Sequence, residues 1–423
     1  MNRSRTPWLW VPTLYFAEGI PYFIVNVVSV TMFKRMGMSN ADLAMYTSLL
    51  YLPWVIKPLW SPLVDVVRTK RWWILAMQVL MTVCFTGLAL SLPSRVGEPV
   101  GAFTLCLIIF YISAMLSATH DIAADGYYML ALDEHQQSLF VGIRSTFYRI
   151  ASVFGQGVIV VAAGLLETRF GDIPKAWTVT LLMSSAIFLA VTVWHIFALP
   201  REREAVPAPG EKRNVLKAFA TFFRKPGVWL AIVFMLLYRL PEALSVKMLT
   251  PFMLDTVGDG GLGLTTAQSG LVYGTVGVIA LTVGGILGGV WSARVGLRKA
   301  LWPMALALAL PCSVYLYMAL AQPSDIATIY FCVALDQFGY GFGFTAYMLY
   351  MIYFSQGEYS TSHYAVCTAF MALSMMVPGF FAGMLQESLG YTGFFVLVMV
   401  CCLATVAVTA LLPSRIDPKF GRK

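Results

Sequence analysis

The chain has 423 residues, of which 59% are hydrophobic and only 12% are charged. Soluble proteins carry about 25% charged residues, so this composition excludes a soluble domain of useful size and indicates a membrane protein with many spans. The net charge of +8 does not indicate nucleic-acid binding, because the basic residues fall in a few short loops, as membrane orientation requires. The seven cysteines lie within apolar runs and lack metal-ligand spacing, so we expect no metal site and no cofactor.

Twelve apolar segments approach the roughly 20 residues that a membrane-spanning helix needs. The first lacks a small-residue cleavage site, so we expect a retained helix rather than a signal peptide. The predicted helices are 8–33, 43–65, 72–93, 99–130, 138–166, 175–198, 228–255, 267–293, 299–321, 326–355, 362–387 and 391–412. A polar stretch rich in Pro, Lys and Arg separates the first six from the last six. We therefore predict an N-terminal half (1–199), a linker (200–227) and a C-terminal half (228–423).

Lys and Arg are unevenly distributed between the loops of the two sides. With the N-terminus placed in the cytoplasm, 19 of the 29 fall on the cytoplasmic side and five on the outer side. Cytoplasmic loops carry the excess of positive charge in membrane proteins. The count therefore predicts that both termini and the linker are cytoplasmic.

A polar motif occurs twice, after predicted helices 2 and 8, at a constant offset of 228 residues. It resembles the loop signature of the major facilitator superfamily, Gly-x-x-x-Asp-Arg/Lys-x-Gly-x-Arg/Lys-Arg/Lys. The first copy matches the signature at Asp65, Lys70 and Arg71, and Arg68 stands where the signature has its second glycine. The second copy matches it at Gly289, Arg294, Gly296, Arg298 and Lys299. Orientation alone explains basic loops but not the matched spacing. The resemblance implies an all-α fold of two six-helix halves around a central cavity, with this motif as a cytoplasmic gate.

Two carboxylates, Asp121 and Asp125, end the apolar run of predicted helix 4. Their four-residue spacing places them on one face of a helix. Charges at membrane depth face a protein interior or a watery cavity rather than lipid. Arg144 and Arg149 on predicted helix 5 supply cations for a switchable acid–base set, although a static ion-pair network joining the helices explains the same charges.

Glu18 is a third candidate acid, next to Pro21 in predicted helix 1. Proline frees a backbone carbonyl and kinks a helix, so Glu18 is expected at a cavity-lining bend. Glu18 is either a site for the proton or the cargo, or the structural ion-pair partner of Lys57 or an arginine. Lys57 itself, beside two prolines, either pairs or snorkels to the interface. The candidates for proton coupling are therefore Asp121, Asp125 and Glu18.

The second half offers its own charged residues in predicted helices 7 and 10. Arg239 and Glu242 are three residues apart and can pair locally; alternatively, the Arg239 fork contacts an anionic cargo. Asp336 is the only acid in the interior of the later helices of this half. Nearby tyrosines could stack on sugar rings, but aromatic helix faces more often belong to the core or to the lipid contact.

Four stretches narrow the resemblance: Trp60 to Asp65 preceded by Lys57, Ala118 to Asp125, Tyr148-Arg149 after Arg144, and Leu237 to Arg239. Together they resemble the AmpG-type muropeptide permease family. The resemblance implies proton-driven import of N-acetylglucosaminyl-anhydro-N-acetylmuramic acid, with or without its peptide, for cell-wall recycling. It also implies a monomer in the bacterial inner membrane, with protons, the lipid bilayer and a small-molecule substrate as partners and no nucleic acid. The substrate-binding candidates are Glu18, Arg144, Arg149, Arg239, Glu242, Asp336, Tyr15 and Tyr148.

Two alternatives stay open. The first is a carrier of the same fold for another cargo, such as an acetyl-CoA-like nucleotide, a free amino sugar or an exported drug; His120, Ala124 and Glu18 depart from the family motif near the predicted cavity. The second is a membrane enzyme using His120 with Asp121 or Asp125. Adjacent helical residues point apart, and no Ser, Cys or metal-ligand partner is evident, so we do not expect an enzyme.

Overall fold

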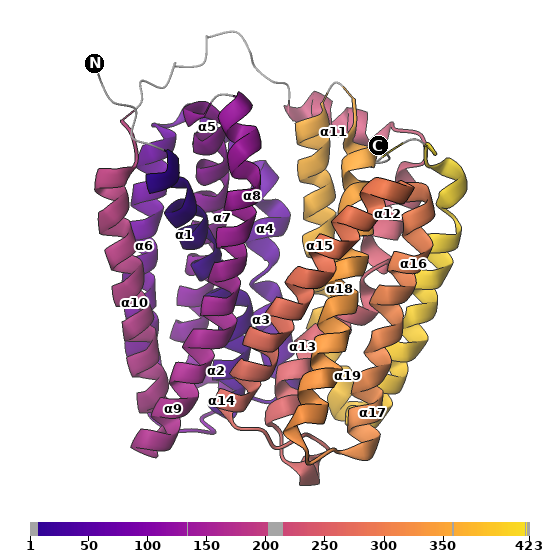
Figure 1. The fold of residues 1–423 in the computed structure, drawn as a ribbon. Helices are drawn as coiled ribbons and strands as arrows, with labels where there is room; N and C mark the ends of the chain where they lie inside the picture. The colour runs from indigo at the N-terminus through magenta and orange to yellow at the C-terminus, as the bar shows by residue number, and fades with distance from the viewer. Residues whose placement is uncertain (1–6, 133, 202–214, 358, 419, 421–423) are drawn as a thin grey trace. The chain divides into compact units, whose positions relative to one another are not determined.

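The computed structural model describes residues 7–132, 134–201, 215–357, 359–418 and 420. All regular elements in these ranges are helices (Figure 1). Their contacts divide the chain into two units, the first made of residues 1–38 and 56–212 and the second of residues 39–55 and 213–423. The predicted half and linker boundaries remain predictions, and residues 202–214 of the predicted linker lie outside the described residues.

The first unit begins with a continuous run of helix from Val11 to Arg35. Pro21 lies inside α1 (Val11–Phe23), and a π-helical segment, Ile24–Val28, follows it before α2 (Ser29–Arg35). Helix α1 packs on α7 and α8, and α6 packs on α7 and α10. The remaining helices of this unit are α5 (Ser61–Val66), α6 (Lys70–Ser91), α7 (Thr104–Ala131), α8 (Glu134–Val153), α9 (Val160–Phe170) and α10 (Ile173–Ala198).

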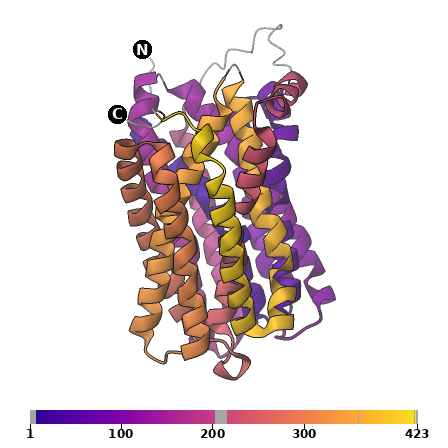
Figure 2. The same cartoon turned by 90° about the vertical axis from the view of Figure 1, so that its right-hand side faces the viewer.

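The second unit has α18 (Ile326–Ser355) in contact with α15 and α16, while α13 packs on α19 (Figures 1 and 2). Helix α19 (Ser360–Ala410) reverses at Gly390 (φ 66°, ψ 172°), which only glycine adopts easily. Figure 2 shows its two arms running in opposite directions. The other helices are α3 (Asn40–Leu49), α11 (Val215–Phe223), α12 (Val228–Leu237), α13 (Leu240–Leu254), α14 (Thr266–Ser269), α15 (Val278–Val295), α16 (Leu297–Ala309) and α17 (Ser313–Ala321).

The prediction of one continuous helix over 43–65 is wrong. The segment contains α3, α4 (Leu52–Ile56), a 3-10 turn at Lys57–Leu59 and α5. Pro53, Pro58 and Pro62 lie along it, and proline both lacks an N–H donor and clashes with the preceding turn of an α-helix. This broken segment places Lys57 on a turn rather than within a straight helix.

Nine helices among the described residues are long and apolar enough to cross a membrane. One of these, Ser362–Arg415, contains both arms of α19. The broken segment 43–65 and α18 are not among the nine, so the count of twelve spans stays a prediction. Helix α18 is long but less apolar, because glycines, tyrosines, Asp336 and Gln337 interrupt its hydrophobic run.

Helix α3 is anchored within the second unit by a buried amide. Asn40 Nδ2 donates to Gln386 Oε1 at 2.7 Å, to Tyr391 Oη at 3.1 Å and to Asp255 Oδ2 at 3.3 Å. A Cβ at Gly383 would lie only 1.9 Å from the carbonyl oxygen of Asn40, so α19 approaches α3 backbone to backbone at this glycine. This contact fixes residues 39–55 to the C-terminal helices.

Candidate functional site

Three carboxyls and two cations from four elements of the first unit meet in one cluster, here called the acid cluster. Glu18 comes from α1, Asp121 and Asp125 from α7, Lys57 from the turn after α4, and Arg144 from α8. The i, i+4 spacing places both aspartates on one face of α7, as expected. Helices α7 and α8 both pack on α1, which brings Glu18 to the same place.

Each aspartate has its own cation. Lys57 Nζ lies 2.5 Å from Asp121 Oδ2, and Arg144 Nη2 lies 2.8 Å from Asp125 Oδ1. Tyr15 Oη donates to Asp125 Oδ1 at 3.1 Å, and its ring lies 4.4 Å below the Arg144 guanidinium. The Asp125 side chain is 41% exposed, so within a membrane-spanning helix it faces a solvated space rather than lipid.

Glu18 is the carboxyl without a cation of its own. It is 8% exposed, the carboxyls of Asp121 and Asp125 are among its charged neighbours, and its Oε2 finds no donor among the described residues. Neighbouring carboxylates repel each other, and a proton on one of them relieves the repulsion. The acid cluster thus brings three carboxyls together with two cations, Lys57 and Arg144.

The other candidates on α8 lie beside the cluster. Tyr148 packs its ring against Phe23 and Tyr22 of α1, with centroids 5.5 and 6.3 Å apart. Arg149 is partly buried and five residues from Arg144, so the two arginines point to different sides of the helix. Arg144 is thus the arginine of this helix that joins the predicted acids.

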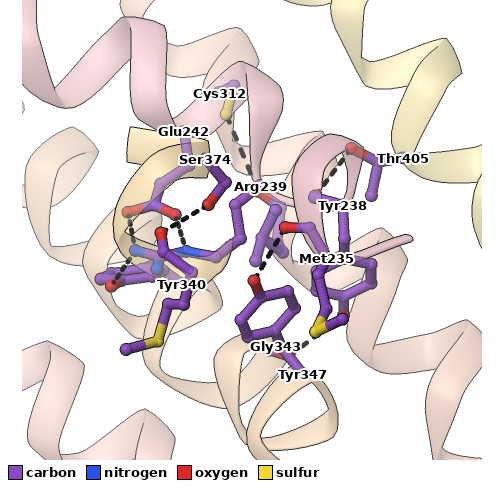
Figure 3. A network of polar contacts seen from close by, with 12 residues as sticks. Met235, Tyr238, Arg239, Glu242, Cys312, Tyr340, Gly343, Tyr347, Ser374 and Thr405 are labelled. Carbon is purple, nitrogen blue, oxygen red and sulfur yellow. Dashed lines mark hydrogen bonds and ion pairs between the residues drawn. The ribbon is translucent and has the colours of Figure 1, made fainter. Parts of the chain in front are cut away.

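In the second unit, Arg239 and Glu242 form a buried ion pair (Figure 3). Arg239 Nε donates to Glu242 Oε2 at 2.7 Å and Nη2 donates to Oε1 at 3.0 Å. Nη2 also donates to Tyr340 Oη at 2.9 Å, and the guanidinium lies 4.7 Å from the centre of the Phe344 ring. The arginine fork is therefore occupied by its own helix, as the local spacing allowed.

Asp336 is separated from that pair and has neutral partners. Tyr315 Oη donates to its Oδ2 at 2.6 Å, and Gln337 Nε2 donates to the same atom at 3.0 Å. It is buried, and over the described ranges no Lys or Arg lies within ion-pair distance of it. Along α18, Asp336 lies one helical turn before Tyr340, the tyrosine that accepts a hydrogen bond from Arg239.

The predicted gate residues of the first copy support helix ends. Arg71 donates from Nη2 to the carbonyl of Ile196 at 2.7 Å and from Nε to that of Leu199 at 3.2 Å, which satisfies carbonyls at the C-terminus of α10. Lys70 is buried and donates to the carbonyl of Val64 at 3.0 Å. The side chain of Asp65 lies outside the described residues, so its expected part in the cytoplasmic gate stays a prediction.

The second copy presents its charges to solvent. Arg294, Arg298 and Lys299 are exposed, and no side chain lies within 4 Å of a Cβ added at Gly289. Gly296 separates α15 from α16 with φ 81°. Arg68, which aligns with Gly296 at the offset of 228 residues, also has a positive φ of 63°. The two loops thus share a residue with positive φ at the same place, although only one uses glycine.

Arg68→Gly is expected to raise the free energy of unfolding by about 1 kcal/mol, because the left-handed region costs a non-glycine residue about 1–2 kcal/mol and glycine's extra freedom in the unfolded chain offsets part of that gain. Thermal unfolding in detergent measures the change. Gly296→Ala is the matched control and should unfold at a lower temperature. An Arg68→Gly variant less stable than the wild type would contradict the prediction.

Sequence reasoning did not predict a buried polar chain in the first unit. His120 Nε2 lies 3.0 Å from Gln78 Nε2, Gln78 Nε2 lies 2.9 Å from His195 Nδ1, and His195 Nε2 lies 3.0 Å from Thr13 Oγ1. All but Thr13 are buried. His120 is thus held by Gln78, on the side of α7 away from Asp121. The signal was present, because Gln78 is a lone amide within an apolar run and must find partners when buried.

The sequence is similar to known transporters over most of its length. A profile of the Major Facilitator Superfamily matches residues 13–354. The chain is 23% identical to "Putative transporter AmpG 4" of Rickettsia conorii over 418 residues, covering 96% of both chains. It is 23% identical to "Anhydromuropeptide permease" of Escherichia coli over 390 residues, covering 90% of this chain and 74% of the relative. The predicted resemblance to AmpG-type permeases is thereby confirmed.

Solved structures with the same fold are also transporters. A bacterial homologue of the human lysosomal transporter Spinster has a TM-score of 0.74 and 15% identity, with 98% of both chains covered. A D-xylose–proton symporter has a TM-score of 0.70 and 14% identity, again over 98% of both chains. At such identities the likeness establishes the fold alone. The profile match over most of the sequence shows that the chain belongs to the Major Facilitator Superfamily and is a multi-pass inner-membrane transporter.

Proposed function

We propose that the chain imports an anionic amino sugar or anhydro-muropeptide, together with protons, by alternating access. The observation that carries the coupling is the acid cluster, in which three carboxyls face only two cations. Two carboxylates about 4 Å apart repel by about 4 kcal/mol at an effective dielectric constant of 20. One proton relieves that repulsion, so the cluster binds and releases a proton as its surroundings change.

Glu18 is the proton carrier in this proposal. Lys57 stabilises the ionised form of Asp121, and Arg144 stabilises that of Asp125, whereas the buried Glu18 forms no ion pair with any described Lys or Arg. A buried carboxyl without a counter-ion is most stable when neutral. Ionisation of Glu18 would require water or a cation to reach it, and a transporter that exposes its interior to each side in turn supplies that change.

The proposed cargo is supported by the relatives named for AmpG and for anhydromuropeptide transport, and by the side chains beside the acid cluster. Arg144 is partly exposed and stacked against the rings of Tyr15 and Tyr128, at 4.4 and 5.2 Å. Stacked guanidinium and tyrosine groups suit a sugar acid, because they combine charge, hydrogen bonding and an apolar ring face.

Uptake by membrane vesicles tests both parts of this function. Radiolabelled N-acetylglucosaminyl-anhydro-N-acetylmuramic acid should accumulate when a proton gradient is imposed, and a protonophore should abolish the accumulation. Unlabelled anhydro-muropeptide should compete, whereas N-acetylglucosamine and acetyl-CoA should not. Competition by acetyl-CoA alone would assign the alternative nucleotide cargo, and accumulation that ignores the protonophore would contradict proton coupling.

A further inference from the structure

Lys247 of α13 is a buried cation that no carboxylate neutralises. Its residue is 5% exposed, and its Nζ donates to Thr47 Oγ1 of α3 at 3.1 Å. The ring of Tyr51 lies 5.4 Å from the same nitrogen. Within the part of the chain that the structure describes, no Asp or Glu lies within ion-pair distance of it. An ammonium has three N–H donors, and the bond to Thr47 is the one hydrogen bond that it makes to the described residues.

The contrast with Arg239 shows which cation of the second unit is available. Both lie on or beside α13 and are equally buried. The Arg239 charge is balanced by two hydrogen bonds to Glu242. Lys247, by contrast, contacts a neutral hydroxyl and an aromatic ring, and no carboxylate among the described residues pairs with it. An anionic ligand therefore gains more from Lys247 than from Arg239, because binding to Arg239 competes with an existing ion pair.

A second unsatisfied donor lies at the same place. Ser48 of α3 is fully buried, and its Oγ has no hydrogen-bond partner among the described residues. A Cβ added at Gly379 of α19 would lie 2.7 Å from Ser48 Oγ and 3.2 Å from Lys247 Cε. The Ser48 hydroxyl and the stem of Lys247 thus both border Gly379, where the absence of a side chain lets the helices pack closely. Two donor-bearing side chains therefore lie beside the same glycine, and no ion pair to Lys247 occurs among the described residues.

Unsatisfied buried donors are costly in a membrane protein. Leaving a buried polar group without a partner costs about 1–3 kcal/mol, and more if it is charged, so such groups are usually kept for a function. A carboxylate satisfies both donors at once, since it accepts up to four hydrogen bonds and cancels the charge. The four-carbon stem of lysine lets the ammonium leave Thr47 for that stronger acceptor.

We infer that Lys247, assisted by the Ser48 hydroxyl, binds the carboxylate of the cargo at the meeting point of α3, α13 and α19. This inference rests on the proposed function, because it identifies which cation recognises the acid of an anionic amino sugar. The sequence favoured Arg239 as the residue that recognises the carboxylate of the cargo. The inference assigns this role to Lys247, eight residues further along the chain in α13.

Binding to the purified full-length chain in nanodiscs tests the inference. The two probes are N-acetylglucosaminyl-anhydro-N-acetylmuramic acid and the same compound with its lactyl carboxylate converted to a primary amide. Wild-type protein should bind the acid more tightly. Lys247→Met keeps the side-chain length but removes the charge, and it should weaken acid binding by tenfold or more, as expected for a hydrogen bond to a charged group. Its amide binding should change less than twofold, which also shows that the variant is folded.

Two controls separate recognition from general effects of charge. Lys247→Arg should keep most of the preference for the acid, and Lys175→Met, at an exposed lysine in the first unit, should keep all of it. Lys247→Met should also unfold at the same or a higher temperature than the wild type, because no ion pair is lost. An unchanged preference for the acid in Lys247→Met overturns the inference alone. Wild-type protein that binds neither probe overturns the proposed cargo and the inference with it.

Discussion

Glu18→Gln is expected to abolish proton-driven accumulation of the cargo while exchange of cargo across the membrane continues. Glutamine has the size of protonated glutamic acid and no proton to release. The variant therefore mimics the transporter with Glu18 permanently protonated. The new amide N–H can donate to the nearby carboxylate of Asp121, as a protonated Glu18 would. Vesicles with an imposed proton gradient should accumulate at least tenfold less cargo, and counterflow of preloaded cargo should change less than about twofold.

The matched control is Asp172→Asn, which removes a carboxylate far from the acid cluster. Asp172 is exposed and caps α10 by accepting a hydrogen bond from the Lys175 N–H, and asparagine caps equally well. Accumulation and exchange should both stay at the wild-type level. This control shows that loss of a carboxylate as such does not uncouple transport.

Asp125→Asn separates the carrier of the proton from a partner in an ion pair. The substitution leaves Arg144 without its carboxylate, so accumulation and exchange should fall together. If Glu18→Gln accumulates cargo normally and Asp125→Asn loses accumulation alone, the coupling role belongs to Asp125 rather than to Glu18.

Glu242→Gln is expected to lower the free energy of unfolding by about 3–5 kcal/mol, the cost of leaving one partner of a buried ion pair uncompensated. The pair is nearly inaccessible, with side chains 6% and 8% exposed. Three aromatic rings lie within 5.7 Å of the guanidinium, but a ring face attracts a cation far less than a carboxylate does. Thermal and denaturant unfolding in detergent micelles measure the loss.

A double substitution tests the cause of this loss. Replacing both partners, Arg239→Met with Glu242→Leu, removes the two charges together, and buried pairs replaced in this way often lose little stability. The double variant should therefore be more stable than Glu242→Gln. If both variants lose the same stability, packing rather than the uncompensated charge is responsible.

The sequence predicted those parts of the site that depend on spacing within one helix. Asp121 and Asp125 share a face of α7 because they are four residues apart, and Arg239 reaches Glu242 because they are three apart. Arg144 was predicted near the aspartates because short loops place consecutive helices side by side. The break in predicted helix 43–65 was also readable from its three prolines.

Partners distant in the sequence could not be assigned in this way. Lys57 lies 64 residues from Asp121, and Lys247 lies 200 residues from Thr47. Each of these residues is a polar group in an apolar run, which shows that it needs a partner but not which one. Choosing among several acids, or recognising that Lys247 has none, depends on how the helices pack.

The anchoring of Asn40 has a consequence for the order in which the chain is made. Gln386, its partner at 2.7 Å, is synthesised 346 residues later. At about 5–20 residues per second, Asn40 leaves the ribosome roughly 20–70 s before the helix that receives it. Helix α3 therefore enters the membrane with a polar side chain whose partners do not yet exist. A nascent chain stopped before α19 should hold α3 loosely, and the second unit is complete only when nearly the last helix has been translated.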